Sequence, residues 1–339
     1  MKNKSIVVDR PRSITLRETE QPTLKAGEAL LRIRCVGVCG TDIHAFRGEQ
    51  PFFEYPRILG HELAAEIVEL AGSDSGFSVG QLVAVVPYLP CGDCVACRRE
   101  RPNCCTQVRV LGVHIDGGMR EYLTVPTSAL VSAQGLDADH LALVECLAIG
   151  FHSVRRSQVQ AGETALVLGA GPIGLGIVQA VKARGARVLV ADVQEERLRF
   201  CQDTFGVDET LMVNADLGER LGECTGGDYP TMVFDATGNV RSMCQAVHYC
   251  AHGGTLVYVG LVKDEIRFAH PDFHKRELTL HASRNATHED FSNVVSGLVD
   301  GSVESSCYIT HRSSMDAFVD DFQKWAQPGS GVLKGLLVL

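Results

Sequence analysis

The sequence predicts an α/β protein in which a mainly β domain is combined with a doubly wound parallel sheet. Three features support this fold class: short alternating apolar runs in the first 145 residues or so, regularly spaced hydrophobic runs in the middle of the chain, and a glycine-rich turn after the first of these. Domains usually contain about 100–200 residues. We therefore expect the 339 residues to form two domains in one subunit.

The N-terminal part carries short apolar runs separated by Gly, Pro and Asp, which is typical of antiparallel strands. These runs are SIVV, EALLRIR, AAEIVEL, QLVAVV and EYLTV. The last 50 residues or so combine helical patterns at 291–299 and 314–325 with a terminal strand at 332–339. We expect this end of the chain to fold back onto the first domain.

The central part repeats a strand at nearly constant intervals. Its apolar, β-branched runs end at Leu168, Ala191, Val213, Asp235, Val259 and Ala282. Successive ends are 22 to 24 residues apart, enough for one strand, one crossover helix and two loops. Six such units predict a doubly wound parallel sheet with helices between the strands, including one at 172–184.

Composition excludes several classes of protein. Hydrophobic residues make up 45% of the chain, and a formal net charge of −9 weighs against nucleic-acid binding. The sequence has neither a secretory signal nor an apolar stretch of about 18 residues, so we expect a cytoplasmic protein without a membrane segment. Thirteen cysteines in a reducing compartment are better explained as metal ligands than as disulfides.

A glycine-rich turn predicts a dinucleotide site. Gly169, Gly171 and Gly174 follow the first central strand and open a helix, where they permit a tight turn, close approach of a pyrophosphate and close helix packing. Asp192 ends the next strand, and an acid there binds ribose hydroxyls and favours NAD over NADP. Two alternatives stay open: Asp192 caps the following helix, or Arg197 accommodates NADP.

Four cysteines predict a structural zinc site. Their spacing is C-x2-C-x2-C-x7-C, and they are Cys91, Cys94, Cys97 and Cys105. Four thiolates suit tetrahedral Zn²⁺ and leave no position for a substrate. Cys104 competes with Cys105 for the fourth position. Other candidate ligands are dispersed along the chain, and singly each is more often a core or surface residue than a ligand.

The chain resembles the zinc-containing medium-chain alcohol, polyol and threonine dehydrogenases over essentially its whole length. The motifs that carry the resemblance are VCGTDIH at 38–44, GHE at 60–62, the four-cysteine loop, LGAGPIG at 168–174, FDATG at 234–238 and the closing strand. The stretches VLGVHIDGG at 110–118 and SRN at 283–285 are similar to bacterial polyol and sugar-acid, galactonate-type, oxidoreductases.

The resemblance implies a GroES-like, mainly-β catalytic domain at 1–147, completed by 286–339. Between these segments it implies a Rossmann domain with a six-stranded parallel sheet at 148–285. In the four-cysteine loop, the family spacing selects Cys105 over Cys104 as the fourth ligand.

The resemblance also implies a catalytic zinc site. Cys39 and His61 match two ligands of this zinc, while Glu62 and Glu145 match two further positions, of which either is the permanent ligand. Thr41 and His44 match the proton-relay positions, although the same residues suit a capped turn with an exposed ring.

One departure from the family lies beside Glu145. Cys146 stands where the family often has proline, and its thiol is an alternative ligand. We disfavour that alternative because neighbouring side chains on a strand point to opposite faces.

The remaining expected contacts are with cofactor and substrate. The cofactor-binding residues are expected to be Gly169, Gly171, Pro172, Ile173, Gly174, Asp192, Arg197, Thr237, Val259, Gly260 and Arg284. Arg284 is also suited to clamp a substrate carboxylate, and His114 is a second candidate for substrate contact.

We therefore expect a zinc-dependent dehydrogenase that transfers a hydride between a secondary hydroxyl of a polyol or sugar acid and NAD⁺. Alternatives are a threonine or simple-alcohol dehydrogenase and, more remotely, a catalytically inactive nucleotide-binding sensor. A zinc-ribbon nucleic-acid module conflicts with the acidic charge and the six-strand pattern. The expected partners are the substrate and further copies of the chain, in a homodimer or homotetramer.

Overall fold

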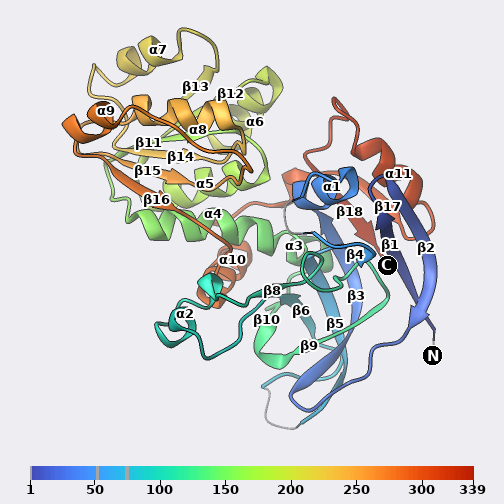
Figure 1. Ribbon diagram of the computed structural model, residues 1–339. Coiled ribbons are helices and arrows are strands. Elements are labelled where there is room, and N and C mark those ends of the chain that lie inside the picture. Colours follow the sequence, from blue (N-terminus) through green and yellow to red (C-terminus); the bar gives the residue numbers. More distant parts are fainter. Residues whose placement is uncertain (1, 51–52, 73–75) are drawn as a thin grey trace. The chain divides into compact units, whose positions relative to one another are not determined.

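A computed structural model describes residues 2–50, 53–72 and 76–339, and the chain divides into two compact units. The β-rich unit comprises Met1–Cys146 and Ala286–Leu339, and the Rossmann unit comprises Leu147–Asn285. Both ends of the chain, blue and red in Figure 1, belong to the β-rich unit. The expected α/β fold class, with a GroES-like part and a Rossmann part, is confirmed.

The β-rich unit is built on a seven-stranded sheet whose order is β10-β6-β5-β3-β18-β17, with β9 also paired to β3. The strands are β3 (Glu28–Val38), β5 (Glu62–Leu70), β6 (Leu82–Val85), β9 (Tyr122–Pro126), β10 (Leu130–Ser132), β17 (Ile309–Ser314) and β18 (Lys334–Val338). A smaller sheet joins β2 (Ser13–Glu20), β1 (Lys2–Arg10) and β4 (Arg57–Ile58). Strand β18 lies antiparallel beside β3, so residues from the end of the chain belong to the same sheet as residues from its N-terminal part.

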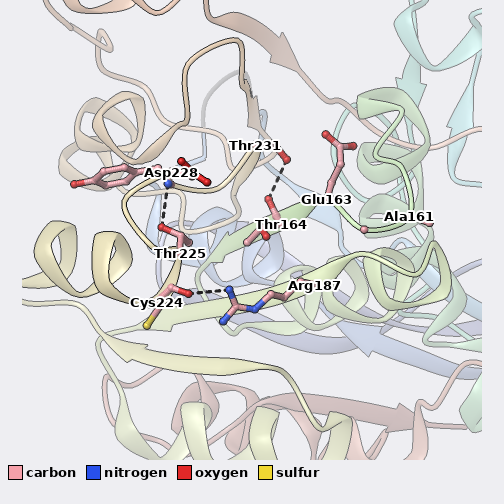
Figure 2. Close-up of a pocket in the computed structure, with 10 residues that line it drawn as sticks. Ala161, Glu163, Thr164, Arg187, Cys224, Thr225, Asp228 and Thr231 are labelled. Atoms are coloured by element: carbon pink, nitrogen blue, oxygen red, sulfur yellow. Dashed lines mark hydrogen bonds between the residues drawn. The ribbon is translucent and has the colours of Figure 1, made fainter.

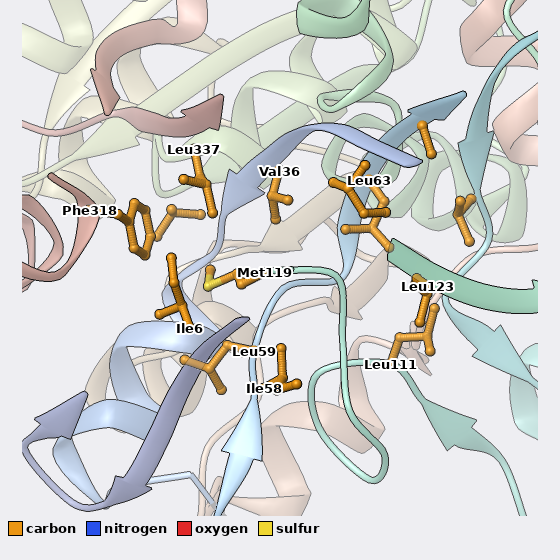
Figure 3. Packing of buried hydrophobic residues seen from close by; sticks show 14 of the residues in the cluster. Ile6, Val36, Ile58, Leu59, Leu63, Leu111, Met119, Leu123, Phe318 and Leu337 are labelled. Atoms are coloured by element: carbon orange, nitrogen blue, oxygen red, sulfur yellow. The ribbon is translucent and has the colours of Figure 1, made fainter. Parts of the chain in front are cut away.

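Helices of this unit include α1 (Gly40–Arg47), α3 (Ala138–Leu141), α10 (His288–Asp300) and α11 (Phe318–Trp325). The helix expected at 291–299 lies within α10. The one expected at 314–325 begins later, because 309–314 pairs with β18 as strand β17. Figure 3 shows side chains of four strands meeting one helix in the core, and these residues are Ile6, Val36, Leu63, Leu337 and Phe318. Burying such a side chain stabilises the fold by about 1.5–3 kcal/mol, so the strands that carry the site are firmly held.

The Rossmann unit contains a six-stranded, wholly parallel sheet with the order β13-β12-β11-β14-β15-β16. The strands are β11 (Thr164–Leu168), β12 (Arg187–Asp192), β13 (Glu209–Met212), β14 (Met232–Asp235), β15 (Thr255–Tyr258) and β16 (Thr279–Ala282). Every strand ends within one residue of the expected position. The strand order reverses beside β11, and ligands of such sheets bind at that reversal.

Helices connect these strands in the alternating pattern that parallel pairing requires. They are α5 (Pro172–Ala183), α6 (Glu195–Phe205), α7 (Leu217–Cys224), α8 (Val240–Ala246) and α9 (His270–Lys275), and α4 (Val144–Ser157) precedes the first strand. Among the described residues, no helix combines the length and the apolar character needed to cross a bilayer.

Candidate metal centres and cofactor site

Three of the dispersed candidate ligands come together in the β-rich unit. Cys39 lies between β3 and α1, while His61 and Glu62 lie at the start of β5, which is paired antiparallel with β3. One ligand atom from each residue lies within 4.8 Å of the others. A thiol, an imidazole and a carboxylate form a donor set that suits Zn²⁺.

Asp42, which sequence reasoning missed, connects two of these residues. Its buried carboxylate accepts hydrogen bonds from the backbone N–H groups of Cys39 (2.9 Å) and Gly60 (3.3 Å). The Nδ1 atom of His61 lies 3.8 Å from Asp42 Oδ1 and is a buried nitrogen without a hydrogen bond in the described part of the chain. A carboxylate behind a histidine commonly orients that ring toward a metal ion. Its position three residues after Cys39, a predicted ligand, could have identified Asp42 from the sequence.

The electrostatics around His61 favour a cation in this cluster. Burial lowers the pKa of His61, but the negative charges of Asp42, Cys39 and Glu145 outweigh it and leave this pKa well above its usual value. Burial raises the pKa of Asp42, and His61 opposes that rise. Several acidic groups thus surround one imidazole.

Glu62 already has a counter-ion, Lys334 of β18. The Lys334 Nζ atom lies 2.6 Å from both carboxylate oxygens of Glu62 and donates to the Val38 carbonyl at 3.3 Å. Both side chains are buried, at 2% and 0% exposure. Burial opposes the charge of Lys334, but Cys146, Glu62 and Cys39 outweigh it and raise its pKa. Sequence reasoning missed Lys334. The sequence pointed to it only by placing a charged residue in the apolar terminal strand.

The approach of Glu62 to β3 requires glycine at position 37. A Cβ atom on Gly37 would lie 2.0 Å from Glu62 Oε2 and 3.0 Å from the Ala142 carbonyl oxygen. No side chain fits in that space, so the residue opposite Glu62 in the ladder contributes only backbone.

Glu145 is buried in the first turn of α4 and accepts a hydrogen bond from the Tyr88 hydroxyl through Oε1. Burial raises the pKa of Glu145, and the nearby His61 opposes that rise. The expectation that positions 145 and 146 lie on a strand was wrong, because 144–157 is helical. On a helix, adjacent side chains are about 100° apart. The buried Cys146 thiol donates to the Leu143 carbonyl at 3.2 Å.

The charges of this cluster fit a divalent cation. Lys334 balances Glu62, and the carboxylates of Asp42 and Glu145 and the sulfur of Cys39 are further acidic groups beside His61. Buried charges are stable only when they are paired or bound to a metal. The donor set, its charge and the orphaned nitrogen of His61 therefore fit the metal that its sequence implies.

Thr41 and His44 lie three residues apart on α1, which places them on the same side of the helix. Thr41 is half-buried. The His44 ring is exposed, and its Nδ1 atom lies 3.1 Å from Glu49 Oε2.

The four-cysteine loop forms a lobe, defined as residues 88–110, that is held at its base by strands β7 (Tyr88–Leu89) and β8 (Arg109–Val110). It also contains α2 (Val95–Arg98) and a 3-10 turn η1 (Pro102–Cys104), and α2 is labelled in Figure 1. The expected four thiols form one group, with Sγ–Sγ distances of 3.4 Å (Cys91–Cys105), 3.5 Å (Cys94–Cys97) and 4.0 Å (Cys91–Cys97). The thiol of Cys104 is exposed and lies outside that group.

Backbone groups lower the pKa of two of the four thiols, Cys94 and Cys105, whereas the side chain of Asp93 raises that of Cys91. Hydrogen bonds from the backbone at Cys97 and Thr106 lower the pKa of Cys94 to about 5. The backbone N–H groups of Cys91 and Gln107 point to Cys105 Sγ at 3.2 and 3.3 Å. Four sulfur atoms at such distances surround a space suited to one tetrahedral ion.

The glycine turn lies at the carboxyl end of β11, where the strand order reverses. Gly174 packs so closely that a Cβ atom there would be 1.8 Å from the Gly169 carbonyl oxygen. Asp192 accepts hydrogen bonds from the backbone N–H groups of Ala170 (2.7 Å) and Gln194 (2.8 Å), so it ties the turn to β12. It does not cap α6, because Gln194 occupies that position.

The other expected cofactor residues surround the same edge of the sheet or lie near it in the chain. Pro172 and Ile173 open α5, and Arg197 Nη1 lies 3.9 Å from the position of a Cβ atom on Gly171. Thr237 follows β14, with its N–H and hydroxyl bonded to Asp235 at 3.0 and 2.6 Å. Three further positions follow β15 and β16, and these are Val259, Gly260 and the exposed Arg284.

A pocket of about 500 Å³ lies at the opposite end of the Rossmann sheet (Figure 2). Thr164 and Arg187 are the first residues of β11 and β12, so this pocket is not at the strand reversal where cofactors bind. Its polar groups bond to one another: Arg187 donates to the Cys224 carbonyl at 2.9 Å, and Thr231 donates to that of Thr164 at 3.3 Å. These contacts support a structural role.

Comparison with known proteins agrees with this arrangement. Residues 25–135 match the family model of the alcohol dehydrogenase GroES-like domain, and residues 172–300 match that of the zinc-binding dehydrogenases. L-galactonate-5-dehydrogenase of Escherichia coli K12 is 41% identical over 332 residues, which cover 98% of both chains.

Two solved structures are similar over the whole chain. An alcohol dehydrogenase from Escherichia coli CFT073, in complex with NADH, superimposes with a TM-score of 0.93 at 31% identity and covers 100% of this chain and 99% of its own. A zinc-binding dehydrogenase from Sinorhizobium meliloti 1021, bound to NADP, has a TM-score of 0.92 at 28% identity and covers 100% of both.

Proposed function

The chain belongs to the zinc-binding alcohol dehydrogenase family and is an oxidoreductase, and we propose that it transfers a hydride between a secondary hydroxyl of a polyol or sugar acid and NAD⁺. The observation that carries the proposal is the buried cluster of Cys39, His61 and Glu62 with its orphaned imidazole nitrogen. The 41% identical relative is named for a reaction on L-galactonate, a sugar acid, which supports the substrate class.

In this proposal Cys39 and His61, with one of the two glutamates, hold a catalytic zinc, and the four thiols of the lobe hold a structural zinc. When bound, zinc polarises the substrate oxygen and nicotinamide accepts the hydride. Asp42 keeps the His61 ring turned toward the cluster. Thr41 and His44 carry the hydroxyl proton toward solvent, and the exposure of His44 supports such an outlet.

The cofactor is proposed to bind at the glycine turn. The N-terminus of α5 offers backbone N–H groups to the pyrophosphate, and Asp192 offers its carboxylate to the ribose hydroxyls. A buried carboxylate at this position repels a 2′-phosphate, which supports NAD over NADP. Arg197 beside Gly171 is then a partner of the pyrophosphate.

The test is NAD⁺ reduction at 340 nm over polyols, sugar acids, threonine and simple alcohols, repeated with NADP⁺ and with zinc measured on the same sample. We expect activity with NAD⁺ on a polyol or sugar acid. Cys39→Ala and His61→Ala should abolish it and remove one zinc, whereas Cys224→Ala, a cysteine outside both clusters, should retain it.

Other outcomes contradict parts of the proposal. Turnover of threonine or simple alcohols alone would replace the substrate class. Two zinc ions without turnover on any compound would reject the polyol and sugar-acid assignment, and a chain without zinc would reject the mechanism. A preference for NADP⁺ would overturn the role given to Asp192.

A further inference from the structure

Tyr88 joins the base of the cysteine lobe to the buried cluster. It is the first residue of β7, paired with Val110 of β8, and it lies three residues before Cys91. Its side chain is buried at 6% exposure, and its ring packs edge-on against Phe291, with centroids 6.4 Å apart. From this fixed position its hydroxyl donates to Glu145 Oε1.

The two candidate glutamates, Glu62 in the cluster and Glu145 beside it, are held in different ways. Both oxygens of Glu62 accept from Lys334 Nζ, so a charged donor already holds its carboxylate. Only Oε1 of Glu145 has a hydrogen-bond donor among the described residues. The Tyr88 hydroxyl therefore fixes the rotation of the Glu145 carboxylate and leaves its second oxygen available.

We propose that Tyr88 is a positioning residue that orients Glu145 toward the zinc held by Cys39 and His61. This inference rests on the proposed function, because it requires a zinc ion in the cluster. A hydrogen bond to a ligating carboxylate is the kind of outer contact whose loss weakens metal binding about 10- to 100-fold. Glu145 is the residue through which Tyr88 acts, so the effect of losing the hydroxyl must depend on Glu145.

The experiment measures zinc release from the purified full chain into a colorimetric chelator, in the absence of substrate and cofactor. Two kinetic phases are expected, and His61→Ala identifies the phase that belongs to the buried cluster. Tyr88→Phe keeps the ring and its packing, and should accelerate that phase about 10- to 100-fold. The phase of the lobe zinc should not change. Tyr258→Phe, which loses a hydrogen bond to the Met243 carbonyl, is the matched control and should release both ions at the wild-type rates.

A double-mutant cycle separates positioning from a general structural role. In a Glu145→Ala background, Tyr88→Phe should have no further effect on the release rate. Equal acceleration in both backgrounds, or no acceleration in either, overturns the inference and leaves the proposed function intact. A wild-type chain that retains only one zinc overturns the proposed function and the inference together.

Discussion

The chain builds its two candidate metal sites in opposite ways. The lobe takes its four thiols from a 15-residue segment, 91–105, and α2 within it buries none of its side chains. The buried cluster takes its groups from positions as distant as Cys39 and Lys334, on strands that share a hydrophobic core. A short loop costs little entropy to close, but a segment without a core needs another source of stability. We therefore expect a metal ion to stabilise the lobe, whereas the fold itself assembles the buried cluster.

The largest expected effect comes from removing a lobe thiol. Structural zinc contributes about 10–16 kcal/mol to folding in small zinc peptides, so Cys97→Ser should lose one zinc and unfold the lobe. Trypsin should then cut faster after Arg98 and Arg99 in the lobe, while the Rossmann unit stays folded. Zinc content and limited proteolysis measure both effects.

Cys104→Ser is the matched control for this prediction, because it removes an exposed thiol beside Cys105 that lies outside the group. It should retain both zinc ions and the wild-type cleavage rate. If Cys104→Ser loses zinc and Cys105→Ser does not, the assignment of the fourth ligand is wrong.

The next largest effect tests whether the fold holds the buried cluster. Lys334→Met leaves the buried Glu62 carboxylate without its partner, and breaking a buried ion pair costs about 3–5 kcal/mol. Chemical denaturation of the β-rich unit should show this loss. Lys324→Met, which breaks an exposed pair with Asp321, should cost less than about 1 kcal/mol. Equal losses in the two variants would show that Glu62 and Lys334 are not a buried charge pair in solution.

The same contrast explains what the sequence could predict. The lobe was predicted residue by residue, because its four ligands are close in sequence and their spacing carries the geometry. The ends of the six central strands were predicted within one residue, because each strand carries an apolar, β-branched run and the runs recur at regular intervals. The family resemblance identified Cys39 and His61, which composition alone would not have selected.

The contacts behind the ligands could not be predicted in this way. Lys334 meets Glu62 only because β18 pairs with β3, a register that no local pattern specifies. Tyr88 meets Glu145 through the packing of the lobe base, 57 residues away in sequence. The assumption that 145 and 146 lie on a strand failed because the apolar residues there belong to the first turn of α4. Long-range pairing decides each of these cases.

A smaller effect is expected at Asp42, inside the buried cluster. Asp42→Asn keeps the size of the side chain but places an amide N–H₂ group where the carboxylate accepts two backbone N–H groups. His61 loses the negative charge beside its ring. The affinity for the zinc of this cluster should fall about 10- to 100-fold, as measured by equilibrium competition with a chelator. An unchanged affinity would mean that Asp42 only shapes the turn.

The smallest effect is expected at Glu49. Its carboxylate lies near Nδ1 of His44, as the carboxylate of Asp42 lies near Nδ1 of His61. The His44–Glu49 pair is closer, at 3.1 Å against 3.8 Å, but its side chains are 56% and 53% exposed, whereas those of His61 and Asp42 are 7% and 1% exposed. Water screens an exposed pair, so Glu49→Gln should change zinc affinity and thermal stability by less than about 1 kcal/mol despite the shorter contact. The same chelator competition and a thermal melt measure these quantities. A loss of more than about 1 kcal/mol would mean that water does not screen the His44–Glu49 pair as its exposure predicts.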